Sequence, residues 1–278
     1  MAFRSHAALC CPLDGLPLEV HEGSVRCPNK HVFDIAKQGY VNLLSAQDKR
    51  SKDPGDSQAM IAARHRFLEA GHYAPVADCI ADLLLPLINH ESVIVDAGCG
   101  EAYYLGRLRE SIFGSGGPEP QFIGFDISKW AMQTAARRFS ASWLVASNRN
   151  IPLRDASVDI LIDMFGFPDF ASFHRIIKPG GLMLRVHAGA NHLLELRQII
   201  YPELKERTPS ATIPDGFSVL QKQHLGFTVS GLGRQSIGDL LLMTPHLFRA
   251  SADGKRRAAA LESLSPSVDV SLELLKRD

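Results

Sequence analysis

Two clusters of residues in this chain have types and spacings that could do chemistry, and the first lies around residue 98. The apolar run Val93-Ile94-Val95 is followed by Asp96-Ala97-Gly98-Cys99-Gly100. Glycines after a strand let the backbone turn tightly and approach a ligand without a Cβ in the way. Asp126 ends the next apolar run, 26 residues after Gly100, where a carboxylate can accept hydrogen bonds from ribose hydroxyls. The spacing predicts a nucleotide-like ligand, although a purely structural turn explains two glycines about as well.

The glycine turn departs from the pattern of NAD-binding proteins. Dinucleotide sites prefer G-x-G-x-x-G, and the third position after Gly100 is Tyr103. Cys99 lies inside the turn, and we interpret it as a small packed residue rather than as a nucleophile. A nucleotide-like ligand other than NAD is therefore favoured.

The second cluster consists of cysteine and histidine residues near the N-terminus. The segment Cys11-Pro12-Leu13-Asp14 is followed by Cys27-Pro28-Asn29-Lys30-His31. A C-x-x-C pair followed by C-x-x-x-H would supply four tetrahedral zinc ligands, and here Asp14 stands at the second cysteine position. We predict a zinc ion held by Cys11, Asp14, Cys27 and His31, with Cys10 as the alternative thiolate. The competing interpretation is a knuckle that has lost its metal and folds by packing against the rest of the chain.

The elements that must position these clusters alternate between strands and helices. Helical spacing of apolar residues predicts helices at 57–69, 74–87, 129–139 and 170–177. Strands are expected at 93–95, 122–125, 142–146, 158–162 and 182–186, the last after the turn Lys178-Pro179-Gly180-Gly181. This alternation predicts an α/β fold with a doubly wound, mostly parallel sheet. The segment before it is small, contains a hairpin around Glu22-Gly23, and would need a staple such as a metal.

Composition sets the broad class of the protein. The 278 residues are 45% hydrophobic and 22% charged, which is typical of globular proteins. The 30 Lys and Arg residues balance the 30 Asp and Glu residues, which excludes a uniformly basic nucleic-acid coat. Residues 26–66 nevertheless carry eight cationic and four acidic side chains. Five cysteines, no secretory signal and no long apolar stretch predict a soluble, cytoplasmic protein without a membrane segment.

Longer segments of the chain resemble known enzymes. VIVDAGCG, GFDIS, the stretch from Ile151 to Asp159 and KPGGLML resemble, in order and spacing, the motifs of class I S-adenosylmethionine (SAM)-dependent methyltransferases. HVFDIAKQGYVNLL, KRSKDPGD and ARHRFLEAGHYAP, together with the two knuckles, resemble the RlmA family, whose members methylate guanine N1 in a hairpin loop of 23S rRNA.

The resemblance implies a Rossmann-like class I methyltransferase fold with a small N-terminal zinc-ribbon-like domain. The expected domains are a zinc-knuckle RNA-recognition domain at 1–45, a basic linker with helices at 46–90, and the SAM-dependent methyltransferase domain at 91–278. The main departure from the family is Asp14, which replaces a zinc cysteine.

The resemblance also implies which residues bind SAM. The glycines would pass beneath its methionine part, Asp96 would lie near its amino group, and Asp126 would hold the ribose. The complete set is Tyr73, Asp96, Gly98, Gly100, Glu101, Asp126, Ser147, Asn148 and His192. Without the resemblance, Tyr73 would be interpreted as a core aromatic and His192 as a surface histidine.

The implied chemistry directs attention to the loop 163–169. Guanine N1 lies on the Watson–Crick edge and carries a proton, so the base must be unpaired and a carboxylate could accept that proton. Asp163 and Asp169 are the candidate catalytic bases by position, and Phe165 or Phe167 could stack on the base. Cationic residues that fit RNA phosphates, or alternatively a solvated face, are Lys49, Arg50, Lys52, Arg64 and Arg66.

The leading hypothesis is a SAM-dependent methyltransferase acting on guanine N1 in a 23S rRNA hairpin, and the resemblance suggests a homodimer. One alternative is methylation of a neighbouring guanine, which would confer macrolide resistance. Others are a small-molecule methyltransferase and a non-catalytic RNA-binding protein that keeps a SAM fold. The intact set of Asp96, Gly98, Gly100 and Asp126 disfavours the non-catalytic reading.

Overall fold

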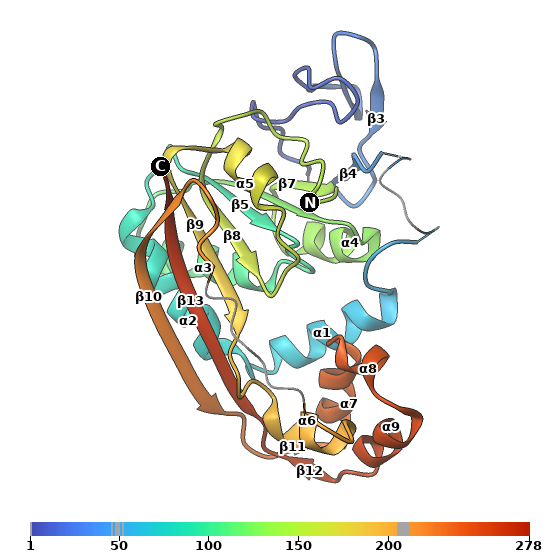
Figure 1. The fold of residues 1–278 in the computed structure, drawn as a ribbon. Coiled ribbons are helices and arrows are strands. Elements are labelled where there is room, and N and C mark those ends of the chain that lie inside the picture. Colours follow the sequence, from blue (N-terminus) through green and yellow to red (C-terminus); the bar gives the residue numbers. More distant parts are fainter. Residues whose placement is uncertain (1, 46, 48–50, 52, 205–211) are drawn as a thin grey trace.

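A central eight-stranded sheet organises the protein (Figure 1). The computed structural model describes residues 2–45, 47, 51, 53–204 and 212–278. The strand order is β10-β13-β9-β8-β5-β6-β7-β4. These strands are β4 (Tyr40–Asn42), β5 (Val93–Ala97), β6 (Gln121–Asp126), β7 (Ser142–Val145), β8 (Val158–Met164), β9 (Ile177–Ala188), β10 (Phe217–Thr228) and β13 (Ser267–Arg277).

The six strands from β4 to β9 pair in parallel, whereas β13 and β10 add antiparallel strands at one edge. Every residue of β5 is buried, as expected for a parallel strand covered on both faces. The prediction of an α/β fold with a mostly parallel sheet is confirmed.

One face of the sheet is covered by helices. These are α1 (Gln58–Glu69), α2 (Ala74–Leu84), α3 (Tyr103–Gly114) and α4 (Lys129–Arg138), and a 3-10 turn, η2 (Leu85–Leu87), follows α2. Ser57 and Ser128 cap α1 and α4, because each hydroxyl accepts a hydrogen bond from the backbone N–H three residues on. Apolar residues of these helices form one core with Ile94, Trp143 and Ile162 of the sheet.

The other face is covered by α5 (Phe170–Ile176) and by the N-terminal segment. This segment forms a three-stranded antiparallel sheet of β1 (Glu19–His21), β2 (Ser24–Arg26) and β3 (Val32–Asp34), with the predicted hairpin at Glu22-Gly23. Leu9, Leu18 and Val25 share a hydrophobic core with Phe125 and Leu144 of the large sheet. Strand β4 pairs with β7, so residues 40–42 belong to the large sheet although they lie within the stretch 1–45.

The C-terminal part adds a helical cluster below the sheet in Figure 1. It contains α6 (Leu194–Ile200), α7 (Arg234–Leu242), α8 (His246–Arg249), α9 (Ala252–Ala259) and the short strands β11 (Leu232–Gly233) and β12 (Ser263–Leu264). Arg66 of α1 reaches buried Asp239 of α7 through two hydrogen bonds of 3.1 and 2.5 Å. This ion pair fixes α1 between the sheet and the C-terminal helices.

Two elements differ from the sequence expectation. Helix α2 ends at Leu84 rather than near Leu87, because Pro86 cannot continue the helical hydrogen bonding. Strand β9 begins at Ile177, so it includes residues 178–181, where the sequence predicts a turn. Its pairing with β8 nevertheless passes from Ile177 to Leu182, so the four intervening residues bulge out of the ladder.

Candidate active site and metal centre

The glycine turn after β5 is held by backbone and carboxylate hydrogen bonds. Gly98 and Gly100 have φ values of 71° and 55°, a left-handed region that glycine enters without a Cβ penalty. The N–H of Gly98 donates to the Phe125 carbonyl at 2.9 Å, and the N–H of Gly100 donates to Oδ2 of Asp126 at 3.0 Å. The other oxygen of Asp126 accepts from the N–H of Ser128 at 2.8 Å. Asp126 therefore fixes the turn from the end of β6.

Three carboxylates converge at the carboxyl ends of neighbouring strands. Asp96 and Asp163 are 1% and 2% exposed, and Asp126 lies beside them on β6. Burial, with added repulsion from Asp163 and Asp126, raises the pKa of Asp96 to about 8. Burial raises the pKa of Asp163 to about 7, although Arg185 opposes the shift. Burial also raises the pKa of Asp126 despite its two backbone hydrogen bonds. These residues thus form an acidic cluster whose carboxyl groups keep their protons to higher pH than exposed aspartates do.

The residues around this acidic cluster fit SAM. Among the described residues, Oδ1 of Asp96 and Oδ1 of Asn148 are buried acceptors without a hydrogen-bond partner. A buried acceptor without a partner is costly, so each calls for a donor from a ligand. SAM carries an ammonium group, an adenine amine and a sulfonium, which suit these acceptors and the surrounding negative charge. Asn148 is otherwise tied through its Nδ2, which donates to the Phe167 carbonyl at 2.8 Å.

Tyr73 and His192 come together although 119 residues separate them. The hydroxyl of Tyr73 lies 3.3 Å from Nε2 of His192, and both side chains are buried. The N–H of Asp269 donates to Nδ1 of His192 at 3.3 Å, which leaves Nε2 as the protonated nitrogen. Burial raises the pKa of Tyr73 well above its usual range, so it stays neutral. The predicted pair is therefore one hydrogen-bonded unit, next to the ring of Phe165.

Glu101 and Ser147 make internal contacts. Glu101 is buried, and its two oxygens contact Nδ1 of His65 at 2.6 Å and Nη2 of Arg138 at 2.8 Å. His65, Glu69 and Glu101 lie close enough to hold a cation, but the Arg138 guanidinium already pairs with both carboxylates. Ser147 accepts a hydrogen bond from the N–H of Arg149 at 3.3 Å.

The two candidate bases have different surroundings. Asp163 is the penultimate residue of β8, in register with Ala97 of β5, and its Oδ1 has no partner among the described residues. Asp169 caps α5 instead, because its Oδ1 accepts a hydrogen bond from the N–H of Ser172 at 3.0 Å. The structure brings Asp163, but not Asp169, to the buried carboxylate pocket.

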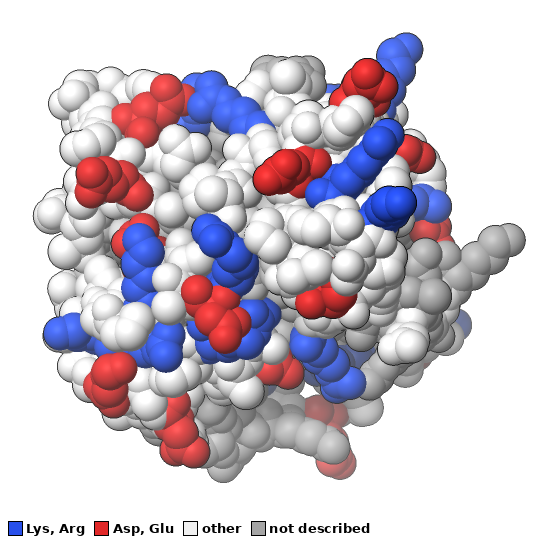
Figure 2. Space-filling view, turned by 90° about the horizontal axis from the view of Figure 1, so that it is seen from above, with Lys and Arg blue, Asp and Glu red and all other residues white. Residues whose placement is uncertain are grey.

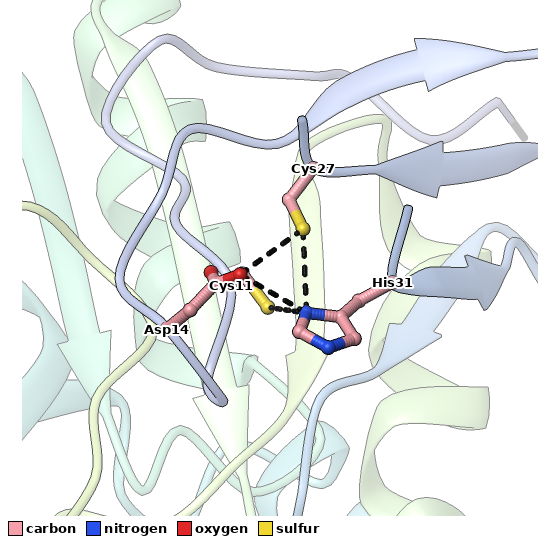
Figure 3. Close-up of side chains that lie close together, drawn as sticks. All are labelled: Cys11, Asp14, Cys27 and His31. Carbon is pink, nitrogen blue, oxygen red and sulfur yellow. Dashed lines mark hydrogen bonds and ion pairs between the residues drawn. The ribbon is translucent and has the colours of Figure 1, made fainter. Parts of the chain in front are cut away.

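The four predicted metal ligands converge from separate loops (Figure 3). Cys11 and Asp14 lie in the loop before β1, Cys27 follows β2, and His31 precedes β3. Nδ1 of His31 lies 3.4 Å from each sulfur and 3.1 Å from Oδ2 of Asp14. Oδ2 of Asp14 lies 3.5 Å from the sulfur of Cys27.

These distances fit a tetrahedral zinc site. A sulfur and a nitrogen bound to one tetrahedral zinc ion are about 3.5 Å apart, given Zn–S and Zn–N bonds of about 2.3 and 2.05 Å. All four ligand atoms lie within 4.8 Å of one another. Cys10 is buried and does not belong to this group; its backbone pairs with Pro17 and Pro152. The residues present therefore suit Zn²⁺, with Asp14 supplying an oxygen ligand.

Comparison with known proteins agrees with both sites. Residues 9–52 match the family described as "RlmA, N-terminal", and residues 94–181 match a methyltransferase domain. A Bacillus subtilis protein named as a 23S rRNA (guanine-N(1)-)-methyltransferase is 32% identical over 273 residues, covering 94% of each chain. The chain belongs to the RlmA family. A second member, the 23S rRNA (guanine(748)-N(1))-methyltransferase of Streptomyces fradiae, is 31% identical over 260 residues and covers 91% of this chain and 90% of its own.

Membership of the RlmA family makes this chain a SAM-dependent methyltransferase with a zinc-ribbon domain. The predicted family, fold class, enzyme class and cofactors are confirmed. In the part of the chain that the structure describes, no helix is both long and apolar enough to cross a bilayer.

Sequence reasoning missed residues that support the pocket from a distance. Asp269 on β13 holds His192, Arg138 on α4 holds Glu101, and Arg64 on α1 lies over the glycine turn. The sequence motifs did not assign these residues a role at the site, and only the packing of α1, α4 and β13 reveals it. Arg64 and Arg66 had been candidates for RNA phosphates, but Arg64 pairs with Asp56 and Arg66 with Asp239. Lys49, Arg50 and Lys52 lie outside the described residues.

Proposed function

We propose that this enzyme transfers the methyl group of SAM to N1 of a guanine in a 23S rRNA hairpin loop. The observation that carries the proposal is the alignment over more than 90% of the chain with proteins named as guanine-N1 methyltransferases of 23S rRNA. The fit of the pocket to SAM and the four-ligand knuckle support it independently. The nine implied cofactor residues and the domain limits 1–45, 46–90 and 91–278 belong to this proposal.

Asp163 is the proposed catalytic base. When bound, SAM supplies an electrophilic methyl group on its sulfonium. The guanine N1–H must lose its proton as the new bond forms, and the free Oδ1 of Asp163 can accept it. A pKa of about 7 leaves a substantial ionised fraction at neutral pH and makes the carboxylate a stronger base than an exposed aspartate. Asp169 serves as a helix cap and is the weaker candidate.

The loop after Asp163 suits the entry of an unpaired base. Gly166 passes so close to Asp163 that a Cβ there would lie 2.2 Å from its Oδ1, so only glycine can close the loop over the carboxylate. Phe165 is 38% exposed and Phe167 is 82% exposed, which leaves two aromatic rings at the mouth. RNA-modifying enzymes use such rings to stack on bases taken out of the helix.

The zinc knuckle lies where it could hold the RNA next to this loop. A cavity of about 230 Å³ is lined on one side by residues 10–15 of the knuckle and on the other by residues 149–152 and Arg175 of the large domain. Asn150 connects the two sides, because its Nδ2 donates to the Pro12 carbonyl at 3.3 Å. Figure 2 shows cationic and acidic side chains interspersed on the face seen from above. This mixture favours recognition of one local RNA feature over the coating of a duplex.

One relative is named for guanine 748 of 23S rRNA. The test must therefore also show which of the neighbouring guanines this enzyme methylates. Primer extension across 23S rRNA from wild-type and deletion strains locates the product, because N1 methylation blocks reverse transcription. We expect a stop in wild type that disappears in the deletion strain and returns with the wild-type gene but not with an Asp163→Asn gene. Identical traces from both strains would refute the rRNA substrate.

The proposal also covers the cellular location and the oligomeric state of the enzyme. An rRNA substrate supports a cytoplasmic location, and the family resemblance supports a homodimer. Strand β10 is an edge strand of twelve residues, and an unpaired edge of this length can add a strand from another chain. Light scattering after size exclusion should give about twice the monomer mass of 30.5 kDa, and the monomer mass would contradict the dimer.

A further inference from the structure

Arg64 occupies the space directly over the glycine turn. Its Nη1 lies 3.3 Å from the position that a Cβ on Gly100 would take. Its Nη2 pairs with Oδ2 of Asp56 at 2.6 Å and donates to the Met243 carbonyl at 3.2 Å. Nη1 has no hydrogen bond to any described residue. The Arg64 side chain is 23% exposed. Its Nη2 is thus held by Asp56 and Met243, whereas its Nη1 lies beside the glycine turn.

The held face is anchored to the ribose side of the pocket. The carbonyl of Asp56 accepts a hydrogen bond from the Ser128 hydroxyl at 2.6 Å, and Ser128 in turn binds Asp126. The positive charge of Arg64 counteracts the rise that burial causes in the pKa of Asp126. Arg64 is therefore placed by the same segment that fixes the glycine turn.

The methionine end of SAM has a charge pattern that the three buried carboxylates cannot satisfy alone. Its ammonium and sulfonium groups are cations and suit Asp96 and its neighbours. Its α-carboxylate is an anion and would be repelled by them. Arg138, the other guanidinium near the turn, is committed to Glu69 and Glu101 through hydrogen bonds of 2.6 and 2.8 Å. Arg64 pairs with only one carboxylate, that of Asp56, and its Nη1 lies next to the glycine turn.

We propose that Arg64 binds the α-carboxylate of SAM through Nη1, while Asp56 keeps the guanidinium aligned. The contact is a charge-assisted hydrogen bond in a partly buried pocket, a kind that is stronger than a neutral one. Arg64 is thus a cofactor-binding residue in addition to the nine that the resemblance implies.

The test compares SAM with decarboxylated SAM, which keeps the ammonium and the sulfonium but lacks the carboxylate. Isothermal titration calorimetry measures the Kd of both compounds for wild type, Arg64→Met and Arg64→Lys. The matched control is Arg137→Met, which removes an equal charge from an exposed position on α4. We expect wild type to bind SAM about 10- to 100-fold more tightly than the decarboxylated compound. Arg64→Met should lose most of this preference, Arg64→Lys should keep part of it, and Arg137→Met should keep it whole.

The proposal fails if wild type does not prefer SAM, or if Arg64→Met keeps the full preference while both compounds bind more weakly. In the second case Arg64 only shapes the pocket. Thermal melting checks that each variant is folded, and if Arg64→Met does not fold, the ratio for Arg64→Lys decides. An unchanged ratio in Arg64→Lys, whose ammonium cannot reproduce the guanidinium geometry, would then overturn the assignment. No RNA is present, so the outcome is independent of the proposed substrate.

Discussion

Replacing Asp96 by asparagine should make the cofactor-free protein more stable and SAM binding weaker. Asp96 is 1% exposed, has an unpartnered Oδ1 among the described residues, and faces two further carboxylates. Ionising it in the folded state is therefore unfavourable, whereas the unfolded chain ionises it freely. SAM, with its two cationic groups, relieves the cost when it binds. Asp96 therefore lowers the stability of the cofactor-free protein and strengthens the binding of SAM.

The sign and size follow from proton linkage. Below pH 4 the carboxyl group is protonated in both states and carries no penalty. Between the unfolded pKa of 3.8 and the folded pKa of about 8, the unfolded state releases the proton first, so stability falls as pH rises. At 1.36 kcal/mol per pH unit, the loss reaches about 4 kcal/mol at pH 7 and levels off above pH 8. An asparagine has no such dependence.

Urea denaturation at pH 5, 6, 7 and 8, followed by tryptophan fluorescence, measures the effect, because Trp143 is fully buried in the core. We expect the free energy of unfolding of Asp96→Asn relative to wild type to rise by about 4 kcal/mol from pH 5 to pH 8. A constant offset of about 1–3 kcal/mol from burying the amide does not alter this slope. SAM affinity should fall at the same time.

The matched control is Asp126→Asn. Asp126 is also in the pocket, but its two oxygens accept backbone hydrogen bonds from Gly100 and Ser128. An amide supplies one acceptor where the carboxylate supplied two, so this variant loses one of these hydrogen bonds at every pH, a cost that Asp96→Asn does not carry. A flat pH dependence for Asp96→Asn relative to wild type would refute the argument that Asp96 is an ionisable group held at a cost.

Three further predictions test the metal site, the base and the packing. Asp14→Cys should hold zinc against a chelator at higher concentrations than wild type, as measured with a chromogenic zinc indicator; unchanged retention would show that Asp14 is not a ligand. Asp163→Asn should slow methyl transfer about 100-fold at saturating SAM, and the wild-type rate should fall below pH 7 as Asp163 is protonated; equal rates would exclude this base. Gly124→Ala should cost about 1–3 kcal/mol in urea denaturation, because its Cβ would lie 2.3 Å from the Trp143 ring, whereas Gly238→Ala, with open space around it, should cost nothing.

Much of the fold and several site residues could be predicted from the sequence because they depend on local signals. The run 93–95, the turn at Gly98 and Gly100, and Asp126 identify a strand, a tight turn and a ribose ligand within a short stretch. The knuckle spacing from Cys11 to His31 similarly predicts a metal site whose four atoms do converge. The strand and helix alternation was sufficient for the sheet type. Such features need only the chain between neighbouring elements.

Tertiary structure alone decided which long-range neighbours complete the site. Tyr73 and His192 meet across 119 residues because the start of α2 and the turn between β9 and α6 are packed together, and Asp269 then orients the histidine. Asp163 and Asp169 have the same chemistry and lie six residues apart, yet one enters the carboxylate pocket and the other caps a helix.

The knuckle and Arg64 show the same limit. Composition suggests that residues 1–45 form a separate small domain, but Leu9 and Val25 lie in the core of the large sheet and β4 is one of its strands. In the sequence, Arg64 is one basic residue among several. Only the packing of α1 shows that it lies over Gly100. The sequence by itself determined the chemistry available and the elements that carry it. Which side chains meet depends on how distant elements pack, because burial and charge pairing act through space and not along the chain.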